Sequence, residues 1–173
     1  MKVSVTKLIS LLHKEGLLKW ANKIGLEGIN IKDYQSKSKK DGSDKHLKVE
    51  RFLMFNESFD GCEILRSNLS NYKIIGVEHI IDNGYINGRV DLILENIAGE
   101  KIIVDFKSTK GIYLDQKLQL SAYKHIYGAK YIAIIDFDTY QIKPLVIDSE
   151  KYFNIIRSLY SIYVNLTQLG EKF

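Results

Sequence analysis

The chain has 173 residues, of which 45% are hydrophobic and 27% charged, proportions that are typical of one folded domain and exclude a disordered chain. The single cysteine, Cys62, excludes an internal disulfide and a cysteine-ligated cluster, and no apolar run is long enough to span a bilayer, so we expect a cytoplasmic protein without a membrane partner. The net charge is +4, but residues 1–51 carry +6 and the remainder −2, which suits a polyanion held by the N-terminal third.

The N-terminal third is expected to be helical. Apolar residues recur at helical spacing over residues 5–28, with Ser4 or Thr6 as the N-cap and a break at Gly16. The polar, lysine-rich residues 33–45 predict a loop or mobile segment, and a helix follows over 46–55.

The rest of the chain alternates strands and helices. Three strands are predicted over residues 71–108, with hairpin turns at Asn83-Gly84 and Ala98-Gly99. A helix, two strands and a closing helix are then expected over 114–127, 130–137, 140–147 and 150–170.

This order predicts an α/β fold with a central mixed β-sheet flanked by helices and an N-terminal helical region. We expect a single domain over residues 1–173, in which 1–70 form a basic helical region and 71–173 the core. The connection from the strand at 101–107 to that at 130–137 is predicted to be a right-handed βαβ crossover.

The stretch 101–107 places an acid and a base near the end of an apolar strand. Because side chains alternate along a strand, Asp105 and Lys107 face one side and Phe106 the other. The hairpin about residues 97–100 brings Asp91 of the preceding strand to the same end of the sheet. Two carboxylates and a lysine suit a hard divalent cation and phosphodiester hydrolysis, although a simple ion pair at a strand end is an open alternative.

Other acids in the chain are weaker candidates. Asp136 and Asp138 repeat the i, i+2 spacing, but no lysine follows and acids are ordinary at turns, so we interpret them as turn residues. Glu78 precedes Asp91 by one hairpin and is a candidate to join or orient the site, ranked below Asp91 and Asp105.

Asp91 followed by Asp105-Phe106-Lys107 resembles the signature of the PD-(D/E)XK nuclease superfamily. The arrangement is most similar to its RecB-like branch, which includes phage and mitochondrial exonucleases. Downstream, Gln119 and Tyr123 match the Q-x-x-x-Y motif of that branch. Upstream, a further segment resembles its G-x-x-x-H-x-x-x-E motif, through Gly42, His46 and Glu50.

The resemblance implies a restriction-endonuclease-like core and a metal held by His46, Asp91, Asp105 and the backbone carbonyl of Phe106. It implies Mg²⁺ or Mn²⁺ as cofactor, and an imidazole ligand favours Mn²⁺. Lys107 would assist the attacking water.

The same resemblance implies that Gln119 and Tyr123 support the site and the nucleic-acid strand. Without it, helix packing explains this pair equally well, and a lone helix histidine such as His46 is more often a solvated or satisfied residue. Lys110 and Lys117 are candidates for phosphate contacts.

The function expected from these motifs is a divalent-metal-dependent DNA exonuclease, and by resemblance the source is a virus, such as a phage, or a mobile element. Two alternatives stay open: an endonuclease of the restriction or junction-resolving type on the same core, and a catalytically silent nucleic-acid-binding protein. Digestion polarity, single- or double-strand preference, DNA against RNA, oligomeric state and the role of Glu50 are not determined by the sequence.

Overall fold

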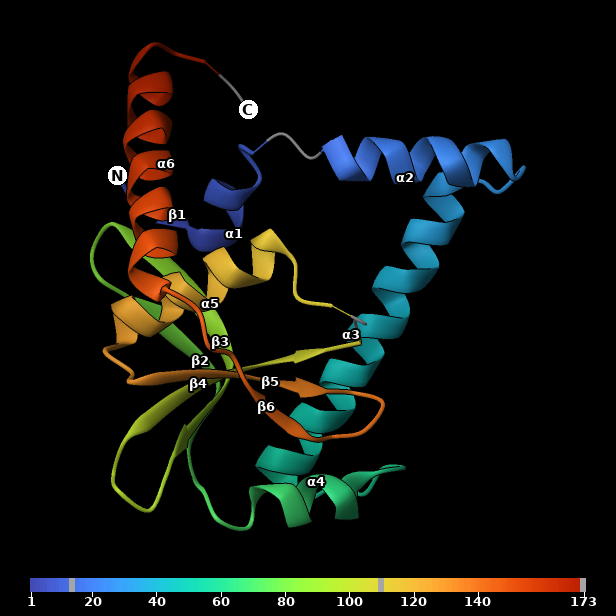
Figure 1. The fold of residues 1–173 in the computed structure, drawn as a ribbon, viewed down its shortest axis with the longest axis vertical. Coiled ribbons are helices and arrows are strands. Elements are labelled where there is room, and N and C mark those ends of the chain that lie inside the picture. Colours follow the sequence, from blue (N-terminus) through green and yellow to red (C-terminus); the bar gives the residue numbers. More distant parts are fainter. Residues whose placement is uncertain (13–14, 109–110, 172–173) are drawn as a thin grey trace.

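The computed structural model describes residues 1–12, 15–108 and 111–171. The protein is α/β, with an open six-stranded mixed sheet flanked by helices, as predicted (Figure 1). Its elements follow in chain order: β1 (Val3–Ser4), α1 (Val5–Ile9), α2 (Glu15–Leu26), α3 (Ile31–Phe55), α4 (Cys62–Leu69), β2 (Lys73–Asp82), β3 (Ile86–Glu95), β4 (Lys101–Lys107), α5 (Leu114–Tyr127), β5 (Tyr131–Asp136), β6 (Ile142–Pro144) and α6 (Ser149–Gln168).

The strands lie in the order β1-β3-β4-β5-β6. Strand β2 is outside this order and pairs with β3. The pairs β2–β3, β3–β4 and β5–β6 are antiparallel, whereas β4 and β5 run parallel and are joined through α5. Both predicted hairpin turns are present, and Gly84 and Gly99 supply the positive φ that such turns require. The predicted meander of three strands corresponds to β2, β3 and β4. The predicted helix before Gly128 is α5 and the closing helix is α6, so these predictions are confirmed.

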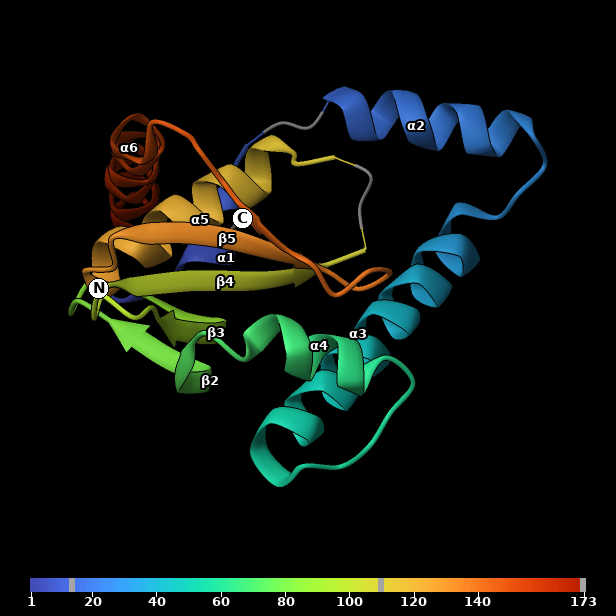
Figure 2. The ribbon, with the colours of Figure 1, turned by 60° about the horizontal axis from the view of Figure 1, so that its bottom comes forward.

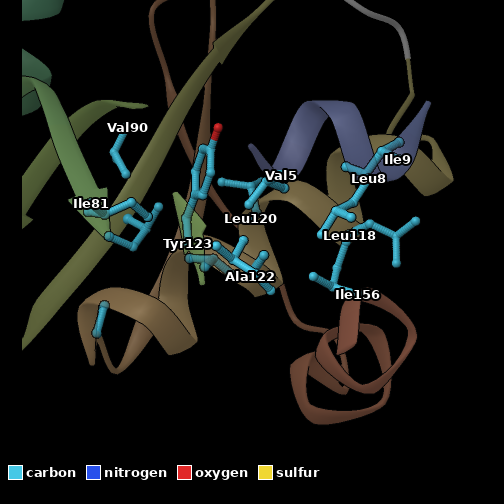
Figure 3. Packing of buried hydrophobic residues seen from close by; sticks show 14 of the residues in the cluster. Val5, Leu8, Ile9, Ile81, Val90, Leu118, Leu120, Ala122, Tyr123 and Ile156 are labelled. Atoms are coloured by element: carbon cyan, nitrogen blue, oxygen red, sulfur yellow. The ribbon is translucent and has the colours of Figure 1, made fainter. Parts of the chain in front are cut away.

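One face of the sheet is covered by α1, α5 and α6. Figure 3 shows the apolar side chains of these helices meeting those of β2 and β3. The buried residues that share this cluster include Val5, Leu8, Leu118, Leu120, Ala122, Tyr123 and Ile156 from the helices and Ile81, Val90, Ile93, Ile103 and Ile134 from the strands.

The opposite face is covered by the C-terminal half of α3 and by α4 (Figure 2). The helix α4 was not predicted from the sequence. Their buried side chains pack on the sheet through a second cluster, which includes Val49, Phe52, Cys62, Leu65 and Leu69 together with Leu92, Leu94, Ile102, Val104, Phe106 and Ile135. The sheet is thus the middle of three layers, and α3 reaches it from the side opposite α5.

The expectation of a loop over residues 33–45 is wrong, because these residues form the first half of the 25-residue helix α3. The Asn30 side chain caps the helix by accepting hydrogen bonds from the backbone N–H groups of Lys32 and Asp33. Val49 and Phe52 bury the other half. A helix anchored at one end extends through polar residues because lysine and glutamine are good helix formers.

Two smaller expectations at the N-terminus are corrected. The helical stretch does divide, but α1 ends at Ile9 and α2 begins at Glu15, so Gly16 lies within a helix and is not its break. A helical glycine costs only about 1 kcal/mol, which tertiary context can offset. The short strand β1 was not foreseen, while Ser4 is the N-cap of α1, as predicted.

Together, α2 and residues 31–45 form what we call the α2–α3 arm. Both ribbon views show the arm standing away from the sheet (Figures 1 and 2). Residues 32–41 are exposed throughout. Across the described ranges no helix has the length and apolar character needed to cross a membrane.

Replacing Gly42 by Ala tests the helical state of residues 33–45. No atom lies within 4 Å of a Cβ built there, so the substitution should stabilise the arm by up to about 1 kcal/mol. We expect amide hydrogen exchange of residues 33–45 to slow about fivefold. Gly128→Ala, at a position with φ of 77°, should instead destabilise the protein. Unchanged exchange in Gly42→Ala would contradict a helix there.

Candidate active site

The centre of the site is a gap between β3 and β4. Their antiparallel pairing ends at Leu92 and Val104, one residue before the two strands would place Asp91 opposite Asp105. The backbone N–H of Phe106 donates a hydrogen bond to Oδ2 of Asp91 at 3.0 Å. A side-chain carboxylate therefore takes the place of a strand partner at this point, and the strands separate around it.

The regular pleat of the hairpin is also interrupted here. Val90 and Leu92 are two residues apart, yet Val90 packs in the cluster beneath α5 and Leu92 in the cluster beneath α3 and α4. A regular strand would point both to one face. On β2, Glu78 has a φ of 49°, which is rare for a residue other than glycine. Irregular backbone of this kind persists only where surrounding structure holds it, and it concentrates at functional sites.

Three potential metal ligands meet on the α3 side of the gap. One ligand atom from each of His46, Glu78 and Asp91 lies within 4.8 Å of the others, a group that could hold a metal ion. Nδ1 of His46 lies 3.6 Å from Oδ2 of Asp91, and Nε of Arg89 lies 2.7 Å from Oε2 of Glu78. Glu50, one turn after His46 on α3, lines the same small pocket.

The acid and base of β4 lie on the α5 side. Nζ of Lys107 is 3.0 Å from Oδ2 of Asp105, so the two share one face, as predicted. Asp105 is only 3% exposed, and its Oδ2 has the Lys107 ammonium group as an ion-pair partner but no well-oriented hydrogen-bond donor among the described residues. A buried carboxylate oxygen without a donor is costly, and a bound cation would satisfy it.

Burial and neighbouring charge set the protonation of the site. Burial, reinforced by the negative charge of Asp91, raises the pKa of Asp105 to about 7, although Lys107 opposes the shift. Burial lowers the pKa of His46, against the opposing effect of Asp91, so the imidazole is held neutral, the form that binds metals. Burial and Asp91 raise the pKa of Glu78. The raised pKa values of Asp105 and Glu78 indicate that the negative charges of the site disfavour one another when no metal ion balances them.

Gln119 and Tyr123 lie together on α5 beside the gap. Nε2 of Gln119 donates a hydrogen bond to the Tyr123 hydroxyl at 3.2 Å. Burial raises the pKa of Tyr123, and the charges of Asp91 and Asp105 add to the shift, which places the hydroxyl near both acids. Figure 3 shows the ring standing among apolar side chains with its hydroxyl at the far end. A Cβ on Gly88 would lie 2.3 Å from this ring, so glycine permits the contact.

An open cleft of about 510 Å³ begins at Asp91 and continues between β3, α5 and the start of α1. The residues that line it are Ser4, Thr6, Ile80, Asn87, Gly88, Arg89, Asp91, Gln119 and Tyr123. Asp91 therefore belongs both to the ligand group and to the cleft, so a molecule in the cleft lies against the candidate metal position.

The structure brings together most residues predicted for the site. His46 and Asp91 belong to the ligand group, and Glu78, ranked below the other acids, joins them. Asp105 lies outside that group but next to Asp91, and its role as a ligand stays a prediction, as does that of the Phe106 carbonyl. Arg89 was missed, although it stands two residues before Asp91, on the same strand.

Other sequence predictions have clear outcomes. Asp136 is the last residue of β5, and its side chain supports the turn that follows: Oδ1 accepts a hydrogen bond from the Asp138 N–H at 2.8 Å, and Oδ2 lies 3.0 Å from Nζ of Lys143. Asp138 is exposed and pairs with Lys45. Lys110 lies outside the described residues.

No protein-family model matches the chain, and no curated protein matches it. Sixteen chains of solved structure match it. One is the crystal structure of SSO0001, with 19% identity and a TM-score of 0.45, over 93% of this chain and 76% of that one. Similarity at this level carries no information on function, which must be argued from the side chains of the site.

The metal-free protein should lose stability as the pH rises toward neutrality. The unfolded Asp105 carboxyl loses its proton near 3.8 and the folded one near 7, so folding binds a proton between these values. The contribution of Asp105 to the free energy of unfolding then falls by at most about 1.4 kcal/mol per pH unit.

Asp105→Asn removes this contribution, and urea titrations in EDTA at several pH values measure it. The free energy of unfolding of the wild type, minus that of the variant, should decrease between about pH 4 and pH 7. A constant difference over that range would show that the folded carboxyl titrates normally.

Proposed function

We propose that the chain is a divalent-metal-dependent nuclease that hydrolyses phosphodiester bonds of DNA, acting as an exonuclease. The observation that carries the proposal is the meeting, at one break in the sheet, of the His46–Glu78–Asp91 group with the Asp105–Lys107 pair. The order of these residues in the chain, with Gln119 and Tyr123 after them, supports the same conclusion through its resemblance to RecB-like nucleases.

The donor set fits a divalent cation. Two carboxylates and a neutral imidazole are ligands for Mn²⁺ or Mg²⁺, and the imidazole favours Mn²⁺. Oδ2 of Asp105, which pairs with Lys107 but has no well-oriented hydrogen-bond donor among the described residues, is a further oxygen beside them. When bound, such a metal lowers the pKa of a coordinated water and polarises the scissile phosphate.

The residues of the chain then have separate tasks. Asp91, fixed by the Phe106 N–H, joins the ligand group to the cleft and holds the site together. Lys107 keeps its ammonium group beside Asp105, where it can orient the attacking water and balance negative charge that develops on the phosphate. Tyr123, hydrogen-bonded to Gln119, presents its hydroxyl beside both acids and can position the strand.

The α2–α3 arm supplies positive charge for a nucleic-acid partner. It carries seven lysines, namely Lys19, Lys23, Lys32, Lys37, Lys39, Lys40 and Lys45. Its helix α3 also carries His46 to the site, so the arm is joined directly to the candidate centre. Exposed cations near a cleft attract and hold a strand through phosphate contacts that weaken with salt.

Digestion of labelled DNA tests the proposal. Wild-type protein should shorten linear DNA in Mn²⁺ or Mg²⁺ and not in EDTA. Asp105→Ala and Lys107→Ala should each lower the rate by at least about a hundredfold, because the first removes a carboxylate beside the metal position and the second removes the cation that balances charge on the reacting phosphate. His46→Ala should raise the metal concentration needed for half-maximal rate.

The matched control is Asp138→Asn, which removes an exposed acid at the same i+2 spacing but in a turn. It should cut like the wild type. Equal digestion by all variants would show that the activity comes from another site or a contaminant, and absence of cutting by every protein would support a silent nucleic-acid-binding role.

Closed circular DNA separates the exonuclease from an endonuclease on the same core. A strict exonuclease leaves circles intact and releases label from one end of a linear substrate first. Conversion of circles to linear or nicked forms, lost in Lys107→Ala, would assign the endonuclease. Single- and double-stranded substrates labelled at either end would then give strand preference and polarity.

A further inference from the structure

Arg89 connects the ligand group to the cleft. It lies on β3 two residues before Asp91, and its side chain is 70% exposed while that of its partner Glu78 is 17% exposed. Its Nε contacts Oε2 of Glu78 at 2.7 Å, and the residue also lines the cleft. One end of the guanidinium therefore faces a candidate metal ligand and the rest faces solvent in the cleft.

The lining of the cleft suits a phosphodiester backbone. Among the described residues that line it, Arg89 is the one cation and Asp91 the one acid. The others include hydroxyl and amide groups from Ser4, Asn87 and Gln119, which can donate to phosphate or sugar oxygens. An arginine fork pairs with phosphate oxygens through two parallel hydrogen bonds.

The negative charge of Glu78 can be balanced either by Arg89 or by a metal ion in the ligand group. Burial raises the pKa of the Glu78 carboxyl, and the negative charges of Asp91 and Glu50 add to the shift, while Arg89 opposes it. Without a metal, Arg89 is the cation that balances Glu78. A divalent ion between His46, Glu78 and Asp91 would supply that balance itself and weaken the attraction that holds the guanidinium. Because the Arg89 side chain is 70% exposed, water screens its attraction to Glu78 and can solvate the released guanidinium.

We propose that Arg89 binds a backbone phosphate of the strand in the cleft, and that a metal in the neighbouring ligand group frees it from Glu78 to do so. Metal and nucleic acid then bind cooperatively, because the metal removes the competitor for the guanidinium. Arg89 is in this sense a substrate-positioning residue. The inference rests on the proposed function.

The test measures binding without cleavage. On an Asp105→Asn background, which keeps all three grouped ligands, Arg89→Gln and Arg89→Lys are compared by the anisotropy of a fluorescein-labelled oligo(dT). In Mn²⁺, Arg89→Gln should bind about tenfold more weakly, with the slope of log affinity against log salt reduced by about 0.7 for one lost phosphate contact. In EDTA the same change should weaken binding less than about twofold, and Arg89→Lys should restore part of the loss in Mn²⁺.

Arg66→Gln is the matched control. Arg66 is 50% exposed and lies 2.7 Å from a glutamate, Glu63, but on α4, away from the cleft. It should leave both the affinity and the salt slope unchanged. Circular dichroism and melting of each variant show that the fold is retained.

The outcomes separate this inference from the proposed function. Calorimetric titration with Mn²⁺ alone, on the wild type and on the Asp105→Asn protein, measures whether each of them binds the metal. If Mn²⁺ binds and the wild type cuts DNA, but Arg89→Gln leaves affinity and slope unchanged, Arg89 only pairs with Glu78 and the inference is wrong. If its effect is equal in Mn²⁺ and EDTA, the metal-linked release is wrong. If Mn²⁺ does not bind the wild type, the proposed function and the release fail together.

Discussion

The site depends on one hydrogen bond that interrupts a strand pair. Because the Phe106 N–H is donated to the Asp91 carboxylate and not to a backbone carbonyl of β3, the ladder between β3 and β4 stops at the point where two acids would otherwise face each other. Asp91 is held at the point where the pairing ends. The ligand group on the α3 side and the acid–base pair on the α5 side both take their positions from this carboxylate.

The local chemistry is costly for the folded chain. Asp105 is buried and has Lys107 as the ion-pair partner of its Oδ2, and Glu78 adopts a rare backbone conformation. Both have raised pKa values because burial and Asp91 disfavour their charged forms. Lys107 and Arg89 offset part of this repulsion. Concentrated destabilisation of this kind is typical of sites whose stability is completed by a bound ion or substrate. Two large apolar clusters, one on each face of the sheet, make it tolerable.

The helix α3 has two parts with different tasks. Its C-terminal half packs Val49 and Phe52 on the sheet, which fixes the position of His46 one turn earlier. Its N-terminal half leaves the core and carries the lysine-rich arm. A single helix therefore links the candidate metal group to the lysine-rich surface that would meet a nucleic-acid strand first. The side chains of this helix change from apolar to polar where it leaves the sheet.

Much of the fold was predictable because it depends on local patterns. Alternating apolar residues, Asn83-Gly84 and the glycine after Tyr127 mark strands, a turn and a helix end through backbone preferences that act over a few residues. The pairing of Asp105 with Lys107 follows from the two-residue period of a strand. Residues 33–45 were mispredicted because their helix is set by an anchor farther along the chain. Only the tertiary structure decided that Glu78 and Arg89 belong to the site, since strand register and the interruption at Asp91 arise from contacts between segments that no local pattern encodes.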